Sequence, residues 1–354
     1  MWNANLVIDQ KYIIYQNLPL LEALVRINTI QRGPLVLFVI DEDNRMVGTL
    51  TDGDSRRALI AGASVNDPVS KVMHRNFIFL TEGVDNDVRH LHEQKQKKMH
   101  LIPVLDKEHH IIDIIDLERF HTKLPIDAVI MAGGKGERLR PFTEKTPKPL
   151  LKIGDKCIID YNVDNLIHCG VEHISVTVNY LKEQIEAHYE QPRDGIKIQT
   201  VREPQFLGTI GGLQFVPEFY HDTILLMNSD LFTNINFEDF YLHFDEHQAD
   251  MSAVAIPYSI SVPYGIFDID HKREIKGISE KPTYNYYANA GIYLIRREML
   301  EKYIPKDVYF NATDFMEKLI SEGRKVIRFP LSGYWIDIGN KQEYQKAQDL
   351  VKHL

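Results

Sequence analysis

The chain has 354 residues, enough for two domains, and its 44% hydrophobic and 26% charged residues exclude a disordered or fibrous protein. A formal net charge of -9 argues against a general nucleic-acid binder, and no apolar run approaches the roughly 20 residues that a membrane span requires. With two cysteines and no basic, then apolar, leader at its start, we expect a cytoplasmic protein with no nucleic-acid or membrane partner.

The first 122 residues predict a tandem of two β-α units. A strand over Leu35–Asp41 is followed by a polar turn, a second short strand and a helix, and residues 101–120 repeat this plan. Helical segments, Leu20–Ile30 and Asp85–Lys98, precede the two copies. We therefore assign residues 1–122 to a separate domain.

This repeat resembles a pair of CBS modules, a family in which a Gly-x-x-Thr-x-x-Asp segment binds an adenosine nucleotide. The segment stands here as Gly48, Thr51 and Asp54. The second copy departs from it at all three positions, which hold Asp113, Asp116 and Arg119. The resemblance implies at most one regulatory adenine nucleotide, at Thr51 and Asp54. Two alternatives stay open: these residues only cap a helix, where Thr and Asp are favoured, or the pair serves mainly as a dimer surface.

The stretch from 126 to 151, IDAVIMAGGKGERLRPFTEKTPKPLL, predicts a polyphosphate site. Its apolar run indicates a strand buried on both faces. Glycines at 133, 134 and 136 then form a turn in which backbone N–H groups approach a bound group. Neither a P-loop nor a dinucleotide fingerprint fits the glycine spacing. The stretch also carries five cations: Lys135, Arg138, Arg140, Lys145 and Lys148.

Strands and helices alternate after residue 126, which predicts a Rossmann-like α/β domain over residues 126–354 with a mainly parallel sheet covered by helices. We expect strands at 171–180, 196–201 and 223–230, and helices at 157–169, 181–189 and 237–248. In such a sheet the ligand site lies at the carboxyl ends of the strands.

The spacing GGxGxRLxPxTxxxPKPL, from Gly133 to Leu150, resembles the signature of the sugar-1-phosphate nucleotidylyltransferases, and the resemblance spans about residues 126–354. It implies that Arg138 binds the departing pyrophosphate and that Lys148 lies at the α-phosphate. It further implies a nucleoside triphosphate and a sugar 1-phosphate as partners. The residues that it assigns to the nucleotide are Ala132, Gly133, Gly134, Gly136, Gly208 and Thr209.

Two distant carboxylates match the metal positions of the same family. Asp230 ends the segment Asn-Ser-Asp, and Asp337 lies in Trp-Ile-Asp-Ile-Gly. The resemblance implies that together they hold Mg²⁺, a hard cation that takes oxygen ligands.

The sugar side is implied by four residues that follow in the family's order. Lys281 would hold the sugar phosphate, Glu280 and Asn289 would bond to sugar hydroxyls or an amide, and Gly265 would let the backbone approach the ring. For Glu280 and Lys281 the alternative is a solvated surface pair.

Glu203 indicates which base the nucleoside triphosphate carries. It precedes Gly208 by five residues, where relatives that handle uracil or thymine carry Gln. An ionised carboxylate only accepts hydrogen bonds, and its two oxygens match the paired N1–H and N2–H donors of guanine. GTP is therefore favoured. The alternative is that Glu203 faces solvent at a strand end.

A CBS pair before a compact transferase resembles the bacterial guanylyltransferases that form GDP-glucosamine or GDP-N-acetylglucosamine for legionaminic acid synthesis. Mannose or heptose 1-phosphate, and uridylyl or thymidylyl transfer, remain alternatives. Three other classes stay open: an inactive nucleotide-sensing regulator, a phosphosugar-binding protein, and an NAD-type oxidoreductase, which the missing third glycine disfavours. We expect a homo-oligomer.

Overall fold

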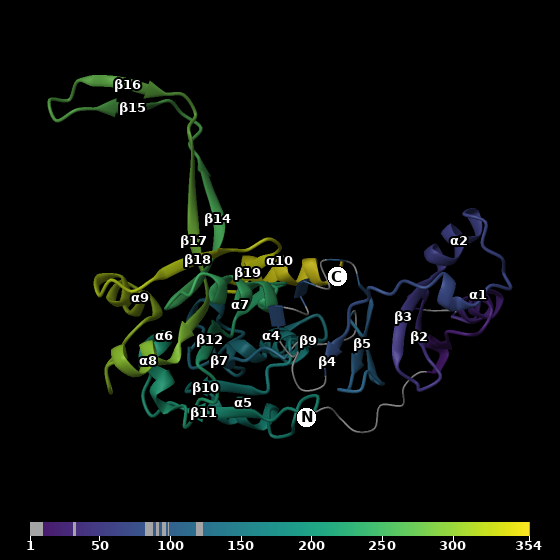
Figure 1. Ribbon diagram of the computed structural model, residues 1–354. Helices are drawn as coiled ribbons and strands as arrows, with labels where there is room; N and C mark the ends of the chain where they lie inside the picture. The colour runs from purple at the N-terminus through teal and green to yellow at the C-terminus, as the bar shows by residue number, and fades with distance from the viewer. Residues whose placement is uncertain are drawn as a thin grey trace. The chain divides into compact units, whose positions relative to one another are not determined.

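The computed structural model describes residues 10–30, 33–81, 88–89, 92–93, 97, 99–117 and 123–353. The chain divides into two compact units, residues 1–122 and 123–354 (Figure 1). Within the described ranges, no helix combines the length and the apolar character needed to cross a membrane.

The first unit contains two three-stranded sheets with the same strand order. In each, the first pair of strands is parallel and the second pair antiparallel. The first sheet consists of β1 (Ile13–Tyr15), β2 (Val36–Ile40) and β3 (Met46–Thr51), and the second of β4 (Leu80–Thr81), β5 (Leu101–Leu105) and β6 (Ile111–Asp116). The sheets thus share the repeated plan expected from the sequence.

Two helices whose bounds the structure describes accompany the first sheet. They are α1 (Leu20–Thr29) and α2 (Asp52–Ile60), with short 3-10 turns η1 (Gln10–Tyr12) and η2 (Val69–Lys71). The helix expected over Asp85–Lys98 falls largely outside the described residues, as does Arg119.

The second unit is built on a seven-stranded sheet with the order β11-β10-β7-β12-β17-β14-β18. The first four of these strands are parallel, β17 is antiparallel to both of its neighbours, and β18 is parallel to β14. The predicted α/β class and mainly parallel sheet are confirmed, although the sheet is mixed. The strands are β7 (Asp127–Met131), β10 (His173–Val178), β11 (Ile198–Arg202), β12 (Thr223–Asn228), β14 (Met251–Ser261), β17 (Thr283–Arg296) and β18 (Val326–Pro330).

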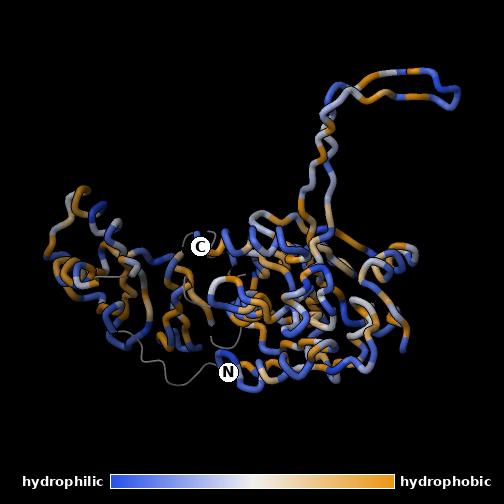
Figure 2. The backbone as a smooth tube through the Cα atoms, turned by 180° about the vertical axis from the view of Figure 1, so that it is seen from behind, coloured by the Kyte–Doolittle hydropathy of each residue, from blue (hydrophilic) through white to orange (hydrophobic). Residues whose placement is uncertain are grey.

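Helices pack in this unit through two apolar clusters. One cluster joins β7, β12 and β17 of the sheet to α6, α8 and α9, and the other joins α4 and α10 to two short strands, β13 (Leu231–Thr233) and β19 (Trp335–Asp337). Figure 2 shows hydrophobic residues concentrated in the body of the unit. The helices and 3-10 turns are α4 (Ile158–His168), α5 (Lys182–His188), α6 (Gly208–Gly211), α7 (Phe237–Glu246), α8 (Arg297–Tyr303), α9 (Ala312–Ser321), α10 (Lys341–Val351), η3 (Glu137–Leu139), η4 (Lys148–Leu150) and η5 (Gly212–Phe215).

Three two-stranded ladders complete the unit. They pair β8 (Lys152–Ile153) with β9 (Lys156–Cys157), β13 (Leu231–Thr233) with β19 (Trp335–Asp337), and β15 (Ile266–Ile269) with β16 (Ile275–Ser279). The β15–β16 pair forms the end of a long projection that we call the arm, residues 256–288, in which the outer parts of β14 and β17 leave the body as a two-stranded ribbon (Figure 1).

Candidate active site

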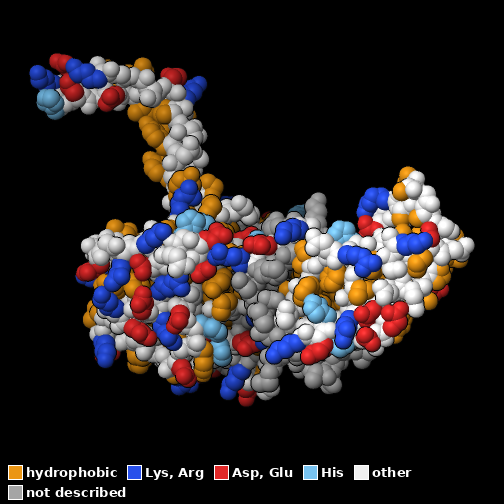
Figure 3. All heavy atoms as spheres, in the orientation of Figure 1, with side chains coloured by type: hydrophobic (Ala, Val, Ile, Leu, Met, Phe, Trp, Pro, Cys, Tyr) orange, Lys and Arg blue, Asp and Glu red, His pale blue; other side chains and the backbone are white. Residues whose placement is uncertain are grey.

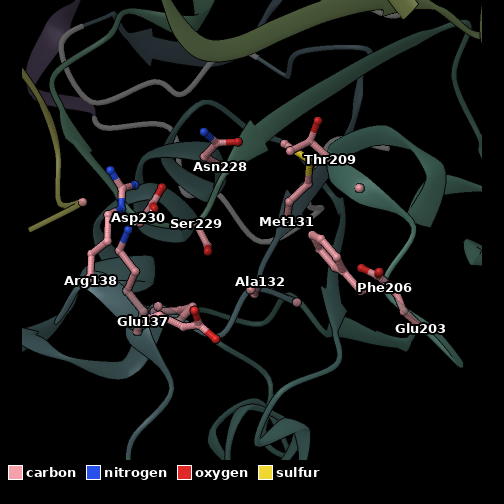
Figure 4. A pocket seen from close by; sticks show the side chains of 17 residues that line it. Met131, Ala132, Glu137, Arg138, Glu203, Phe206, Thr209, Asn228, Ser229 and Asp230 are labelled. Carbon is pink, nitrogen blue, oxygen red and sulfur yellow. Dashed lines mark hydrogen bonds and ion pairs between the residues drawn. The ribbon is translucent and has the colours of Figure 1, made fainter. Parts of the chain in front are cut away.

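A cavity of about 390 Å³ lies where β7 and β12 end, the edge at which an α/β sheet is expected to bind its ligand. Figure 4 shows Arg138 and Asp230 at one end of it and Glu203, Phe206 and Thr209 at the other. The lining residues are Met131, Ala132, Gly133, Gly134, Gly136, Glu137, Arg138, Lys148, Pro149, Glu203, Phe206, Gly208, Thr209, Asn228, Ser229, Asp230 and Gly339.

The glycine turn forms one wall of this cavity. Gly136 has a left-handed backbone (φ 61°), and its carbonyl accepts a 2.8 Å hydrogen bond from the Thr143 hydroxyl. A Cβ at Gly136 would lie 3.0 Å from Thr143 and 3.1 Å from Lys148. At Gly134, by contrast, a Cβ would meet no described atom within 4 Å. Packing of the chain therefore requires glycine at 136, whereas the space beside Gly134 is open to a ligand.

Lys148 and Asp230 line one end of the cavity, and Asp337, the second predicted metal carboxylate, lies beside Lys148. The Lys148 side chain is buried, its Nζ donates to Asp230 Oδ2, and it lies 4.0 Å from Asp337 Oδ1. The β13–β19 ladder causes this meeting, because Leu231 pairs with Asp337 and the Ile338 N–H donates to the Asp230 carbonyl at 3.0 Å. The structure thus brings together carboxylates that lie far apart in the sequence.

The electrostatics of this end suit a hard cation. Burial and the neighbouring charge of Asp230 raise the pKa of Asp337, although Lys148 and Arg138 oppose the rise. The Oδ1 atoms of Asp230 and Asp337 are buried and have no hydrogen-bond partner among the described residues. Two carboxylates beside the same ammonium, each with a buried oxygen that lacks a hydrogen-bond partner, are a ligand set that Mg²⁺ accepts. The residues therefore fit the predicted metal.

Arg138 completes the cationic end. Its guanidinium lies against Gly339, where a Cβ would be only 3.2 Å from the nearest guanidinium nitrogen. The other three cations of the turn, Lys135, Arg140 and Lys145, are exposed and do not line the cavity. Of the five cations that the sequence places in this stretch, Arg138 and Lys148 are the two that line the described cavity.

Glu203 lies at the opposite end. It directly follows β11, its N–H donates to the Val178 carbonyl at 2.9 Å, and the residue is 4% exposed. The alternative that it faces solvent is therefore wrong. Burial raises the pKa of its carboxyl, partly offset by hydrogen bonds with Thr177 and Leu207. Its Oε2 is buried without a partner in the described structure, so a ligand with N–H donors would satisfy it.

In the loop after Glu203, Gly208 and Thr209 pack against the chain around α9, whereas Phe206 faces the cavity. Gly208 has φ +82°, and a Cβ there would lie 2.6 Å from the Phe310 carbonyl oxygen. The Thr209 hydroxyl accepts from the Ala312 N–H at 2.8 Å, so it binds the start of α9. Phe206 is 46% exposed and lines the cavity beside Glu203. The sequence analysis did not predict Phe206 as a site residue, although its position as an aromatic residue between Glu203 and Gly208 could have indicated it.

The four predicted sugar residues do not line this cavity. Gly265, Glu280 and Lys281 lie between the ribbon and the end of the arm, and a Cβ at Gly265 would be 3.0 Å from Glu280 Oε2. Asn289 lies at the base of the arm, where its side chain donates to the Tyr293 hydroxyl at 2.7 Å and accepts from the Gly291 N–H at 3.0 Å. Their role in sugar binding stays a prediction.

In the first unit, Thr51 and Asp54 form a capping box at the start of α2, as the helix-cap alternative expected. Burial opposes ionisation of Asp54, but hydrogen bonds with Thr51 and the 2.5 Å ion pair with Arg57 outweigh it and lower its pKa. A second cavity, of about 510 Å³, is lined by Thr51 together with Phe38, His100 and other residues, although Asp54 is not among them.

The comparisons with known proteins agree with this geometry. The model of the nucleotidyl transferase family matches residues 127–353, so the chain belongs to this family. Mannose-1-phosphate guanylyltransferase catalytic subunit beta of Danio rerio is 30% identical over 226 residues, which cover 61% of this chain and 62% of that protein. The bifunctional protein GlmU of Methanococcus maripaludis is 29% identical over 232 residues, 63% of this chain and 54% of its own.

Among solved structures, HddC from Yersinia pseudotuberculosis superposes with a TM-score of 0.50 at 26% identity, covering 64% of this chain and 99% of that chain. The chain thus spans less than two thirds of the length of the two curated relatives, and the match to the family model lies in the second unit.

Proposed function

We propose that the protein transfers a nucleotidyl group from a nucleoside triphosphate to a sugar 1-phosphate and releases pyrophosphate. One observation carries this proposal: a single cavity is lined at one end by a glycine turn, two cations and Asp230, with Asp337 beside Lys148, and at the other end by a buried carboxyl group with one unpartnered oxygen. The triphosphate of a nucleotide requires the cationic end, and its base requires the end with a hydrogen-bond acceptor.

In the proposed reaction, a phosphate oxygen of the sugar phosphate attacks the α-phosphorus in line, and the bond to the pyrophosphate breaks. No side-chain nucleophile is needed, because positioning and charge neutralisation supply most of the catalysis in phosphoryl transfer. Lys148 would stabilise charge at the α-phosphate, and Arg138 with the turn amides would bind the pyrophosphate. Asp230 and Asp337 would hold Mg²⁺, which supplies further neutralisation of the phosphates when bound.

GTP is the proposed donor. The buried Glu203 carboxylate has an unpartnered oxygen, and guanine presents two adjacent N–H donors to such an acceptor. A base without those donors would leave the carboxylate unsatisfied, at a cost of about 1 to 3 kcal/mol. The Danio rerio relative is a guanylyltransferase by name, which supports the same choice.

The acceptor is proposed to be glucosamine or N-acetylglucosamine 1-phosphate, as in GDP-aminosugar formation for legionaminic acid. The basis is the resemblance of the first unit to a CBS pair. Mannose 1-phosphate, the substrate in the name of the Danio rerio relative, and heptose 1-phosphate are the competing acceptors.

We further propose that an adenine nucleotide binds the first unit beside Thr51 and regulates the transferase. The supporting observation is the cavity of about 510 Å³ that Thr51 and the apolar residue Phe38 line.

The test is pyrophosphate release with a matrix of GTP, UTP, dTTP, CTP and ATP against glucosamine, N-acetylglucosamine, mannose and heptose 1-phosphates. The expected result is release with GTP and an aminosugar 1-phosphate. Better turnover of mannose or heptose 1-phosphate would correct the sugar alone, and better turnover of UTP would correct the base. Nucleotide binding without pyrophosphate release from any pair would support the inactive sensor instead.

A further inference from the structure

The arm is an amphipathic ribbon that the described chain leaves uncovered. Its stalk, residues 256–261 and 283–288, pairs Tyr258 with Tyr286 and Ile260 with Tyr284, so these four side chains share one face. All four are 42 to 55% exposed. The opposite face carries the pair Pro257–Tyr287 nearest the body and is polar further out, with Ser259 hydrogen-bonded to Asn285 and Ser261 to Thr283. Figure 3 shows the stalk hydrophobic along one side.

The apolar surface of the arm is large enough for a stable protein contact. Eleven large apolar side chains between residues 258 and 287 are 37 to 73% exposed, and they lie on both faces of the arm. At roughly 100 Å² apiece they offer about 1,100 Å², compared with the ~800 Å² that each partner buries in a standard interface. A two-stranded ribbon is also marginally stable alone, so a surface that covers the apolar side chains of the arm would stabilise it.

The arm also carries chemistry that the cavity lacks. The two cations that line the described cavity, Arg138 and Lys148, are both assigned to the triphosphate, and a sugar phosphate needs another. Lys281, with Glu280 and Gly265 beside it, lies at the far end of the stalk. Six stalk residues at about 3.3 Å each place this group roughly 20 Å from the body.

The pairing of the stalk is unbroken, so the structure holds it away from its own cavity. From Ala255 and Asn289 outward, the β14–β17 ladder pairs every residue up to Ser261 and Thr283, and its register shift lies inside the body, between Ala253 and Ala255. β14 runs parallel to the sheet strands that end at the cavity, so the stalk leaves from the same edge of the sheet.

From these observations we infer that the arm exchanges between two copies of this chain, and that Lys281 and Glu280 of each arm complete the sugar-phosphate side of the other copy's cavity. The inference rests on the proposed function for the role of these residues. Exchange of identical arms is reciprocal and closes as a two-fold dimer, which would cover both apolar stalk faces.

Complementation between two inactive variants tests the exchange. Asp230→Asn disables the cavity and Lys281→Ala disables the arm, so each alone is expected to lose most turnover. When the two are co-expressed in equal amounts, half of the dimers are mixed and one of their two sites is intact, which predicts about one quarter of wild-type turnover. The matched control is Asp230→Asn with Asp337→Asn, which places both lesions in the cavity and should recover nothing.

The outcomes separate the alternatives. An arm that closes over its own cavity gives no recovery in the mixture, and near-wild-type turnover of Lys281→Ala removes the arm from the site; either result overturns the inference. Failure of the wild type to release pyrophosphate refutes the proposed function instead.

A readout independent of activity then decides the exchange. A photo-crosslinking residue in place of Ile278, in the full-length chain mixed with an isotope-labelled copy, should link across copies to peptides of the body. Links within one copy, or none, would refute the exchange.

Discussion

Asp230 and Asp337 should both be needed for turnover, yet their replacement by Asn should change the stability of the empty protein in opposite directions. Asp230 is the direct partner of the Lys148 ammonium, whereas Asp337 lies 4.0 Å from it. Removing one member of a buried ion pair typically costs 3 to 5 kcal/mol. Because Asp230 is 22% exposed and Asp337 remains nearby, we expect about 2 to 3 kcal/mol for Asp230→Asn.

For a unit of this size the loss corresponds to a decrease in Tm of roughly 4 to 12 °C. Asp337→Asn should instead unfold at or above the wild-type temperature. Its pKa is raised, so the folded state holds the proton more tightly than the unfolded chain, and ionisation of Asp337 lowers stability as the pH increases. The advantage of Asp337→Asn should therefore be present at neutral pH and fade in acid.

Thermal unfolding with and without Mg²⁺, beside pyrophosphate release, provides the assay. The wild type should gain Tm on addition of Mg²⁺ in proportion to its binding, and both variants should lose most of this gain together with orders of magnitude in turnover. If Asp230→Asn were as stable as the wild type, or Asp337→Asn were equally destabilised, the assigned charge balance would be wrong. Near-normal turnover of either variant at saturating Mg²⁺ would remove that residue from the site.

Three further predictions concern other parts of the chain. Glu203→Gln should lose the preference for GTP over UTP, and an undiminished preference would exclude Glu203 as the residue that recognises the base. The wild-type KM for GTP should rise as the pH falls toward the raised pKa of Glu203, whereas the KM of the variant should show no such rise. Gly136→Ala should lower stability by about 1 to 2 kcal/mol, measured by urea unfolding, whereas Gly134→Ala should keep full stability and bind GTP more weakly; equal effects would contradict the assigned roles. Asp54→Ala should cost about 0.5 to 2 kcal/mol through the lost cap and weaken AMP, ADP or ATP binding by calorimetry, while no heat from the wild type would leave the first unit without a nucleotide.

The sequence allowed the elements of the second unit to be predicted, because its signals are local. The apolar run before Gly133 is β7, and the helix expected over 157–169 is α4 (Ile158–His168). The meeting of Asp230 with Asp337 could be inferred only from the family resemblance. β13 and β19 have three residues each, which is too short for a period-2 pattern to identify them as partners.

The arm shows a different limit of sequence reasoning. Alternation along residues 256–261 indicates a strand with one apolar face, but the pattern is the same whether that face packs on the chain's own body or on another copy. Lys281 was therefore assigned to the sugar phosphate by its order in the sequence, whereas the structure separates it from the cavity. Alternation of apolar and polar residues identifies the apolar face of a strand, but it does not identify the surface that packs against that face.

Lys148 connects the stability of the site to its proposed chemistry. Two half-buried carboxylates at one point repel each other, and the Lys148 ammonium, bonded to Asp230 and 4.0 Å from Asp337, is the charge that lets them coexist. A triphosphate brings several negative charges into the same space, so an ammonium committed to the carboxylates could not serve the α-phosphate as well. In the proposed reaction, substrate binding would therefore change the partner of Lys148, and the carboxylates would gain a replacement cation at the same time. The unpartnered Oδ1 atoms of Asp230 and Asp337 provide the ligands for that replacement, which is why the metal and the triphosphate should bind with positive cooperativity.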